Sequence, residues 1–269
     1  MVDEMNLKNN YEFFTHLLKI NLKSLTSLRG AFLLQATFMI INNLVFFTMW
    51  WVFFKKFKSI KGWEITDLCA LYGVVAFVFG VSVIFFGGVR SLAKMIDGGD
   101  LDVYLTQPKN TLFYASSSQS HASGWGDVVS GIILLWFSGY LTFGSLPLML
   151  TVLFCSFVVF VCIGILFNSL AFWMGPMDSL ARQFYDFVVT FSIYPQVIFS
   201  QFLKMILFTV IPGGFIGHLP VSLLREFSWS NLGFLVVGSA GFFILSVVVF
   251  NRGLKKYESG NRFIGVGTN

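Results

Sequence analysis

The chain has 269 residues, of which 56% are hydrophobic and only 12% are charged. Because soluble domains carry about a quarter charged residues, this chain has too little polar surface to cover a water-soluble globule of its length. The apolar content excludes a disordered chain, and three cysteines cannot build a disulfide framework. The composition therefore predicts an all-α integral membrane protein, with the three cysteines as small buried apolar side chains.

Before the first long apolar stretch, the apolar side chains recur at steps of three and four residues, and Glu12, Lys19 and Lys23 lie between them. This spacing predicts an amphipathic helix over residues 9–28. Such a helix either lies along the cytoplasmic membrane interface or packs on a soluble partner, and its lysine-bearing polar side favours the interface. The apolar residues are Phe13, Phe14, Leu17, Leu18, Leu22, Leu25 and Leu28.

Uncharged intervals locate the membrane spans, because a helix needs about 20 mostly apolar residues to cross the hydrocarbon. The interval between Asp127 and Asp178 is long enough for two spans joined at residues 144–147, and Pro195 interrupts the fifth span. We expect no ionisable side chain inside the spans. The six predicted spans are residues 30–54, 68–89, 127–144, 147–174, 187–204 and 231–250.

Six spans place both termini on the same side of the membrane. The loops on that side, together with the two terminal segments, hold twelve of the 18 Lys and Arg residues. Because cytoplasmic loops are enriched in these residues, both termini are expected in the cytoplasm, although the lysines between Lys55 and Lys61 argue locally for the opposite orientation. In a membrane protein the net charge of +5 reflects such basic loops rather than nucleic-acid binding.

The segment 205–224, which precedes the last span, is apolar and uncharged apart from His218. It is broken at Pro212, Gly213 and Gly214 and again at Pro220, so an unbroken span is not expected. Two short half-helices that dip into the outer leaflet fit the pattern better. Such a segment either lines a pathway or closes the outer end of the bundle.

The residues that usually carry catalysis are missing from the sequence. There is no HExxH or GxSxG motif, no metal-ligand spacing of Cys and His, and no GxxxxGK[ST] phosphate loop. We therefore expect no enzyme activity, no metal and no cofactor in this chain.

Uncharged polar side chains do occur at the expected membrane depth. They either form hydrogen bonds between helices or line a route for a polar substrate. Asn42 and Asn43 are the best candidates for the second role, because adjacent positions point about 100° apart on a helix. The candidate pathway residues are Asn42, Asn43, Asn168, Gln196 and Gln201.

The polar segment 90–110 follows the second predicted span. It starts as a helix, is expected to stop at Gly98-Gly99, restarts with Asp100 as a helix cap and ends at Pro108. A simple linker has little need for apolar residues, and this segment should present them to another surface. These residues are Leu101, Val103, Tyr104 and Leu105.

Residues 95–108 of this segment resemble the cytoplasmic loop of the permeases of type-2 ABC exporters, in the branch encoded as two permeases beside an ATPase. Four more segments are similar to that family and occur in the same order, so the resemblance covers nearly the whole chain. These segments are Ile60–Trp63, Leu170–Trp173, Ile211–Pro220 and Arg252–Gly260.

The resemblance implies a multi-pass subunit of the bacterial inner membrane with six spans and cytoplasmic termini, which forms half of an ATP-driven export pathway. It also implies a second permease, the same chain or a related one, and two ATPase subunits that bind ATP and Mg. A coupling helix at about residues 94–108 would dock in a groove of the ATPase, and Gln107, where relatives commonly have arginine, would weaken one polar contact. The coupling residues would be Lys94, Asp97, Gly98, Asp100, Leu101, Asp102, Tyr104, Leu105 and Pro108.

Two alternatives remain open. The chain could be a carrier that works alone on an ion gradient, or a membrane assembly factor that transports nothing. The absence of ionisable residues from the predicted spans weighs against the carrier.

Overall fold

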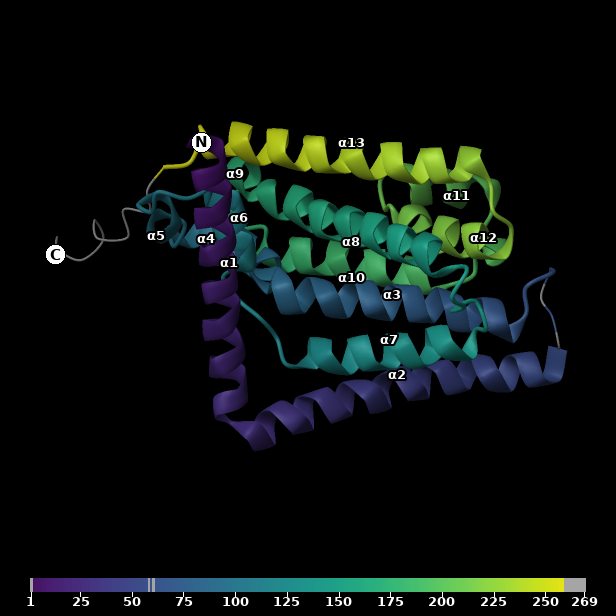
Figure 1. Cartoon of the computed structure of the whole chain (residues 1–269). Helices are drawn as coiled ribbons and strands as arrows, with labels where there is room; N and C mark the ends of the chain where they lie inside the picture. The colour runs from purple at the N-terminus through teal and green to yellow at the C-terminus, as the bar shows by residue number, and fades with distance from the viewer. Residues whose placement is uncertain (1, 58, 60, 259–269) are drawn as a thin grey trace, which may run out of the picture.

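The computed structural model describes the backbone of residues 2–57, 59 and 61–258, and the side chains of these ranges from Glu12 onward. In these ranges the chain is built of helices, and six of them run alongside one another as a bundle (Figure 1). The six are α2 (Arg29–Phe57), α3 (Ile65–Phe85), α7 (Ser123–Phe137), α8 (Leu146–Ser169), α10 (Asp178–Ile193) and α13 (Trp229–Leu254).

The remaining helices lie at the two ends of the bundle (Figure 1). We call the end where α13 finishes the terminal end and the opposite end the distal end. The terminal end holds α1 (Val2–Ser27), η1 (Gly87–Ser91), α4 (Leu92–Gly98), α5 (Asp102–Leu105), α6 (Thr111–Ser117) and α9 (Ala171–Met174). The distal end holds η2 (Gln196–Ile198), α11 (Gln201–Thr209), η3 (Gly214–His218) and α12 (Leu219–Arg225).

Glycines line the most extensive helix contact in the bundle, between α3 and α7. A Cβ atom added to Gly80 would lie 2.6 Å from the Gly124 carbonyl oxygen, and one added to Gly124 would lie 2.8 Å from the Gly80 carbonyl oxygen. On the other side of α7, a Cβ atom on Gly126 would collide with the Ala36 carbonyl oxygen of α2. Small residues therefore let three backbones approach closely, as is typical of helices in membranes.

Four segments are long and apolar enough to cross a membrane: α2, α3, Leu146–Met174 and α13. A bent helix pair, α11 with residues 214–225, would add a fifth. Helices α7 and α10, with 15 and 16 residues, run beside these segments but are shorter than the roughly 20 residues of a full crossing. The apolar all-helical architecture agrees with the sequence, whereas the count of six spans stays a prediction.

Two of the predicted spans do not match the helices of the structure. The third predicted span, 127–144, corresponds to α7, which starts at Ser123 and ends at Phe137, so that Asp127 lies inside the helix. The fifth, 187–204, is not one helix. Helix α10 ends at Ile193, because the proline at position 195 forces Tyr194 into an extended conformation, and the next α-helix starts at Gln201.

The amphipathic segment forms α1, which runs across the terminal end of the bundle (Figure 1). The Phe14 ring lies 5.2 Å from the Phe113 ring and 6.2 Å from the Phe86 ring, measured between centroids. The Asn21 side-chain amide donates a hydrogen bond of 3.2 Å to the Ser117 carbonyl oxygen. Helix α1 is therefore attached to the bundle through α6 and through the end of α3.

The segment before the last helix is broken at residues 210–213, as the sequence predicts, but the second predicted break, at Pro220, is wrong. Helix α11 is followed by the turn around Pro212, and η3 then continues into α12, so that the two arms meet at an angle of 88°. Pro220 lies in the first turn of α12, where a missing N–H group costs nothing. Most of the second arm is buried, including His218, whose Nε2 atom lies 2.8 Å from the Tyr194 carbonyl oxygen.

The three cysteines are free and buried, as the sequence predicts. Cys69 lies in α3, and Cys155 and Cys162 lie in α8. They take part in the apolar interior of the bundle, where a thiol packs like a small hydrophobic side chain.

Candidate coupling interface and polar residues of the bundle

Helix α4, the first half of the predicted coupling segment, is embedded in the terminal end of the bundle. Leu92, Ala93, Met95 and Ile96 are buried in one apolar cluster with residues of α8, α9 and α13. The helix ends where Gly99 adopts a left-handed conformation with φ of +77°. The predicted stop at Gly98-Gly99 is therefore confirmed.

Two hydrogen bonds attach α4 to its neighbours. The Ala93 N–H group, in the first turn of α4, donates to the Asn168 side-chain oxygen of α8 at 3.1 Å. The Met177 N–H group, just before α10, donates to the Asp97 carboxylate at 3.1 Å. Because both contacts involve helix ends, a displacement of α4 would act directly on α8 and α10.

The Asp97 carboxyl has an unusual environment for a residue at the surface. Desolvation raises its pKa above the ordinary aspartate value, and the nearby Asp178 carboxylate acts in the same direction. The hydrogen bond from Met177 acts in the opposite direction, because it favours the charged form.

Leu101 was expected to face a partner protein, but its side chain points into the chain itself. It is fully buried in the same apolar cluster as α4, and its N–H group donates to the Met95 carbonyl oxygen at 3.2 Å. The cap also differs from the prediction, because α5 starts at Asp102 with Leu101, rather than Asp100, in the preceding position. Leu101 therefore folds α5 back onto α4 and is unavailable to a second protein.

The outer face of the coupling segment still presents apolar side chains. Val103 is 62% exposed and Leu105 is 41% exposed, whereas Tyr104 is half-buried, with its ring centroid 4.9 Å from that of Tyr114. The residues around this apolar pair complete the candidate coupling face. Lys94, Asp97, Asp100, Gln107 and Pro108 are exposed, while Gly98 and Asp102 are half-buried.

The candidate pathway residues fall into different environments. Asn168 is buried, and its amide nitrogen donates to the Gly164 carbonyl oxygen at 2.8 Å, so both ends of its side chain are used within the chain. Asn43 is half-buried, and its amide nitrogen donates a hydrogen bond to α7. Asn42 and Gln201 are exposed, and Gln196 lies half-buried in the short turn η2. Of these five candidates, Asn42 is the one that lies exposed in the middle of a long apolar helix.

The structure places a carboxylate inside the bundle, contrary to the expectation of uncharged spans. The Asp127 side chain on α7 is buried, and one of its oxygens accepts a hydrogen bond of 2.9 Å from the Asn43 amide of α2. The other oxygen is buried and has no partner within the described residues. In the sequence, Asp127 marks the start of the third predicted span. The signal that could have revealed its burial is Asn43 in the first span, a polar side chain able to pair with it.

A second buried carboxylate, Asp67 in the first turn of α3, holds together the segments before α3 and before α8 and the end of α12 at the distal end. It accepts hydrogen bonds from the Tyr140 hydroxyl at 2.7 Å and from the Glu64 N–H group at 2.9 Å, and it forms an ion pair with Arg225 at 3.4 Å. Desolvation, and then the Asp67 carboxylate, raise the pKa of the Tyr140 hydroxyl to about 12, so it remains a hydrogen-bond donor. Arg225 also donates to the Gly62 carbonyl oxygen at 2.9 Å. This network fixes the end of α12 and was not foreseen from the sequence.

Comparison with known families identifies the chain. A family model described as "ABC-2 family transporter protein" matches residues 31–261. Comparisons with curated proteins and with solved structures found no match. The family match covers the bundle together with the coupling segment and the re-entrant arms, which agrees with the resemblance seen in the sequence. The chain therefore belongs to the ABC-2 family of transporter proteins and is an integral membrane permease subunit of an ABC transporter.

Proposed function

We propose that the chain is the permease of an ATP-driven exporter and that an ATPase drives it through the segment between α3 and α7. Family membership implies a partner ATPase, and the chain itself has no phosphate loop. ATP and Mg would bind to that ATPase, two copies of which would serve a pair of permeases. The observation that carries the proposal is the exposed apolar pair on α5, on a segment hydrogen-bonded to the ends of α8 and α10.

The mechanism follows from these attachments. Closure of the ATPase dimer would push on the face that carries Val103 and Leu105. Because α4 is packed and hydrogen-bonded to α8 and to the start of α10, the push would tilt these helices rather than only bend a loop. Helix α1 would follow, since its Phe14 ring packs on Phe113 of α6. ATP-driven transport requires that the conformations before and after this tilt differ in their affinity for the cargo.

The second permease would pack against α2. Gln35 and Asn42 are seven residues apart, so both lie on the same exposed face of this helix. An exposed amide is costly in hydrocarbon, and a protein partner can satisfy it. Six crossings, including the short α7 and α10, and both termini in the bacterial cytoplasm complete the proposed topology.

The coupling proposal is tested by a matched pair of substitutions in the permease purified with its ATPase. Leu105 on the coupling face and Leu146 at the distal end are 41% and 40% exposed, respectively. Leu105→Asp should lower the amount of ATPase that co-purifies by at least tenfold, whereas Leu146→Asp should not change it. Leu101→Asp is unsuitable as a test, because a charge at that buried site would unfold the segment.

Equal retention of the ATPase by both variants would overturn the coupling proposal.

The stand-alone carrier is tested separately, by reconstituting the permease without any ATPase. Uptake driven by a proton or sodium gradient in those vesicles would support the carrier and point to Asp127, the buried carboxylate of α7.

A further inference from the structure

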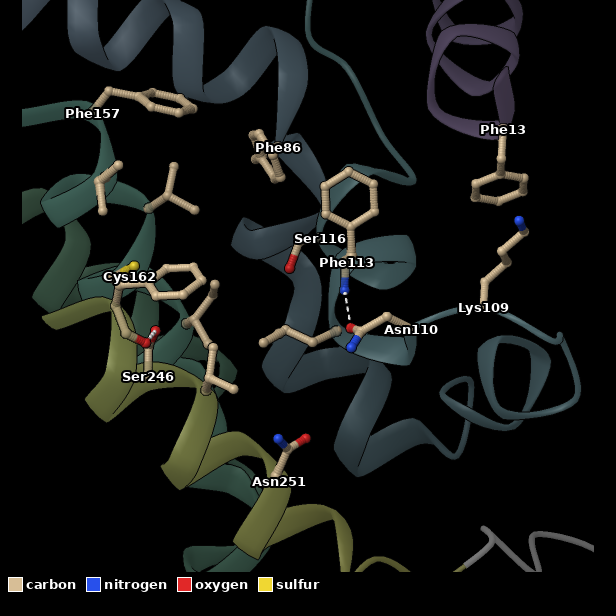
Figure 2. A pocket seen from close by; sticks show the side chains of 16 residues that line it. Phe13, Phe86, Lys109, Asn110, Phe113, Ser116, Phe157, Cys162, Ser246 and Asn251 are labelled. Atoms are coloured by element: carbon tan, nitrogen blue, oxygen red, sulfur yellow. Dashed lines mark hydrogen bonds between the residues drawn. The ribbon is translucent and has the colours of Figure 1, made fainter. Parts of the chain in front are cut away.

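A cavity of about 550 Å³ opens at the terminal end, within the size range of small-molecule binding sites. It lies between α8 and α13 on one side and α6 on the other, with Phe13 of α1 and the loop before α6 at its edge (Figure 2). Most of its wall is apolar, including Phe86, Phe157, Val161 and Val247. A largely apolar molecule would fit this space.

One polar group inside the cavity lacks a partner. The Ser116 side chain is 1% exposed, and its hydroxyl has no hydrogen-bond partner among the described residues. Figure 2 shows this hydroxyl directed toward the open space between α6 and α8. Because a buried hydroxyl usually forms a hydrogen bond, an oxygen of a bound molecule would complete its environment.

The rim of the cavity is polar and carries a cation. Asn110 and Asn251 are exposed at the rim, and the Lys109 ammonium lies 5.4 Å from the centroid of the Phe13 ring. The apolar wall reaches the outer surface at Phe243 of α13, which is 55% exposed. A molecule in the cavity would thus have an apolar part that faces the hydrocarbon and a polar end beside a positive charge.

We infer that this cavity binds a membrane phospholipid with an anionic headgroup. One acyl chain lies among the apolar residues, an ester oxygen accepts a hydrogen bond from Ser116, and the phosphate lies near Lys109. A neighbouring pocket of about 410 Å³ shares Phe86, Phe113 and Phe157 with the cavity and takes the second chain. The lipid joins the interface helix α1 to α6, α8 and α13, and this role does not depend on the proposed ATPase coupling.

The test uses the full chain in phosphatidylcholine nanodiscs that contain phosphatidylglycerol with a photoactivatable diazirine in its acyl chain. Labelled residues are identified by mass spectrometry of peptides. Label should concentrate in residues 111–117 and 157–165. Val247→Phe, which fills the cavity, should reduce it at least fivefold. Val248→Phe, at the next position of the same helix and outside the cavity, should leave it unchanged.

Two further variants test the polar contacts. Lys109→Gln should reduce labelling by the phosphatidylglycerol probe about threefold and labelling by a phosphatidylcholine probe much less, whereas Lys255→Gln should affect neither. Ser116→Ala should weaken labelling without adding bulk, which keeps the test decisive if Val247→Phe does not fold. Label spread evenly over α2 and α13 and insensitive to these changes would overturn the site, and equal labelling by both probes would overturn the anionic headgroup.

Discussion

Helices α2 and α3 are both apolar but have opposite environments. Both are apolar and long enough to cross a membrane, yet 72% of the most apolar stretch of α3 is buried, compared with none of that of α2. Helix α3 packs against α7, α8 and the re-entrant arm, whereas α2 contacts mainly α7. The difference shows that apolar composition places a helix in the membrane without specifying which helices it contacts, because lipid tails are as apolar as leucine. Glycines and polar side chains specify those contacts.

The largest effect is expected at the contact that makes α3 central. Gly80→Val would drive the new side chain into the backbone of α7 at Gly124 and Val128. Rigid backbone cannot move aside like a side chain, so we expect a loss of about 3 kcal/mol or more and little monodisperse protein in size-exclusion chromatography. Gly241→Val on α13 is the control, since its Cβ atom would meet nothing within 4 Å. Similar yields of the two variants would contradict the prediction.

A smaller effect is expected where α2 meets α7. Gly126→Val would collide with the Ala36 carbonyl oxygen and push α2 outward, while the contacts between α3 and α7 stay in place. Because most of α2 is exposed in the chain, we expect a loss of about 1–3 kcal/mol. Loss of a disulfide cross-link engineered between α2 and α7 would measure the displacement. Gly30→Val, whose Cβ atom has free space, should preserve the cross-link.

Loss of the hydrogen bond between α2 and α7 should lower the stability by less than either of these glycine substitutions. Asn43→Ala removes the hydrogen bond to Asp127 and leaves the carboxylate buried, with neither oxygen paired to a side chain of the described residues. We expect a loss of about 1–2 kcal/mol and a lower thermal midpoint of the isolated chain in detergent. Asn42→Ala is the matched control, because Asn42 is the next residue of the same helix and its side chain is exposed. A lower midpoint for Asn42→Ala alone would reverse the assignment of the two asparagines.

The exposed face of α2 should tolerate substitution while reporting on its partner. Met49 is 54% exposed and lies seven residues after Asn42, so Met49→Cys should change the stability by less than about 0.5 kcal/mol. In membranes, a bifunctional maleimide should cross-link it to a second permease. Val237→Cys on α13, 71% exposed, should cross-link far less. Stronger cross-linking through α13 would place the permease contact on the opposite side of the bundle.

The parts of the fold that the sequence could predict depend on local signals. Charge-free intervals gave the main apolar helices, the three- and four-residue spacing gave α1, and the break near Pro212 gave the re-entrant arms. The boundaries of α7 and α10 were wrong because an uncharged interval does not have to be helical throughout. The non-helical segment 138–145 and the extended Tyr194 are as free of charge as the helices beside them.

The site was predicted less completely, because its residues act through contacts between distant segments. Val103 and Leu105 form an exposed apolar pair, as expected, but Leu101 is buried, since the chain reverses direction at Gly99. Asn168 was a candidate both for the pathway and for a hydrogen bond between helices, and its side-chain oxygen accepts a hydrogen bond from Ala93 of α4, 75 residues earlier in the sequence. No local pattern could have shown that contact.

The sequence by itself determined that this protein resides in a membrane, that it is helical, that its charged residues gather outside most of its apolar helices, and that it belongs to the ABC-2 family. These properties follow from composition and order along the chain. Only the tertiary structure decided that Asp127 and Asp67 are buried, that α3 is enclosed while α2 is exposed, and that Ser116 faces a cavity. The physical reason is that burial and hydrogen bonding depend on which helices meet, and hydrophobicity alone does not distinguish a helix neighbour from lipid.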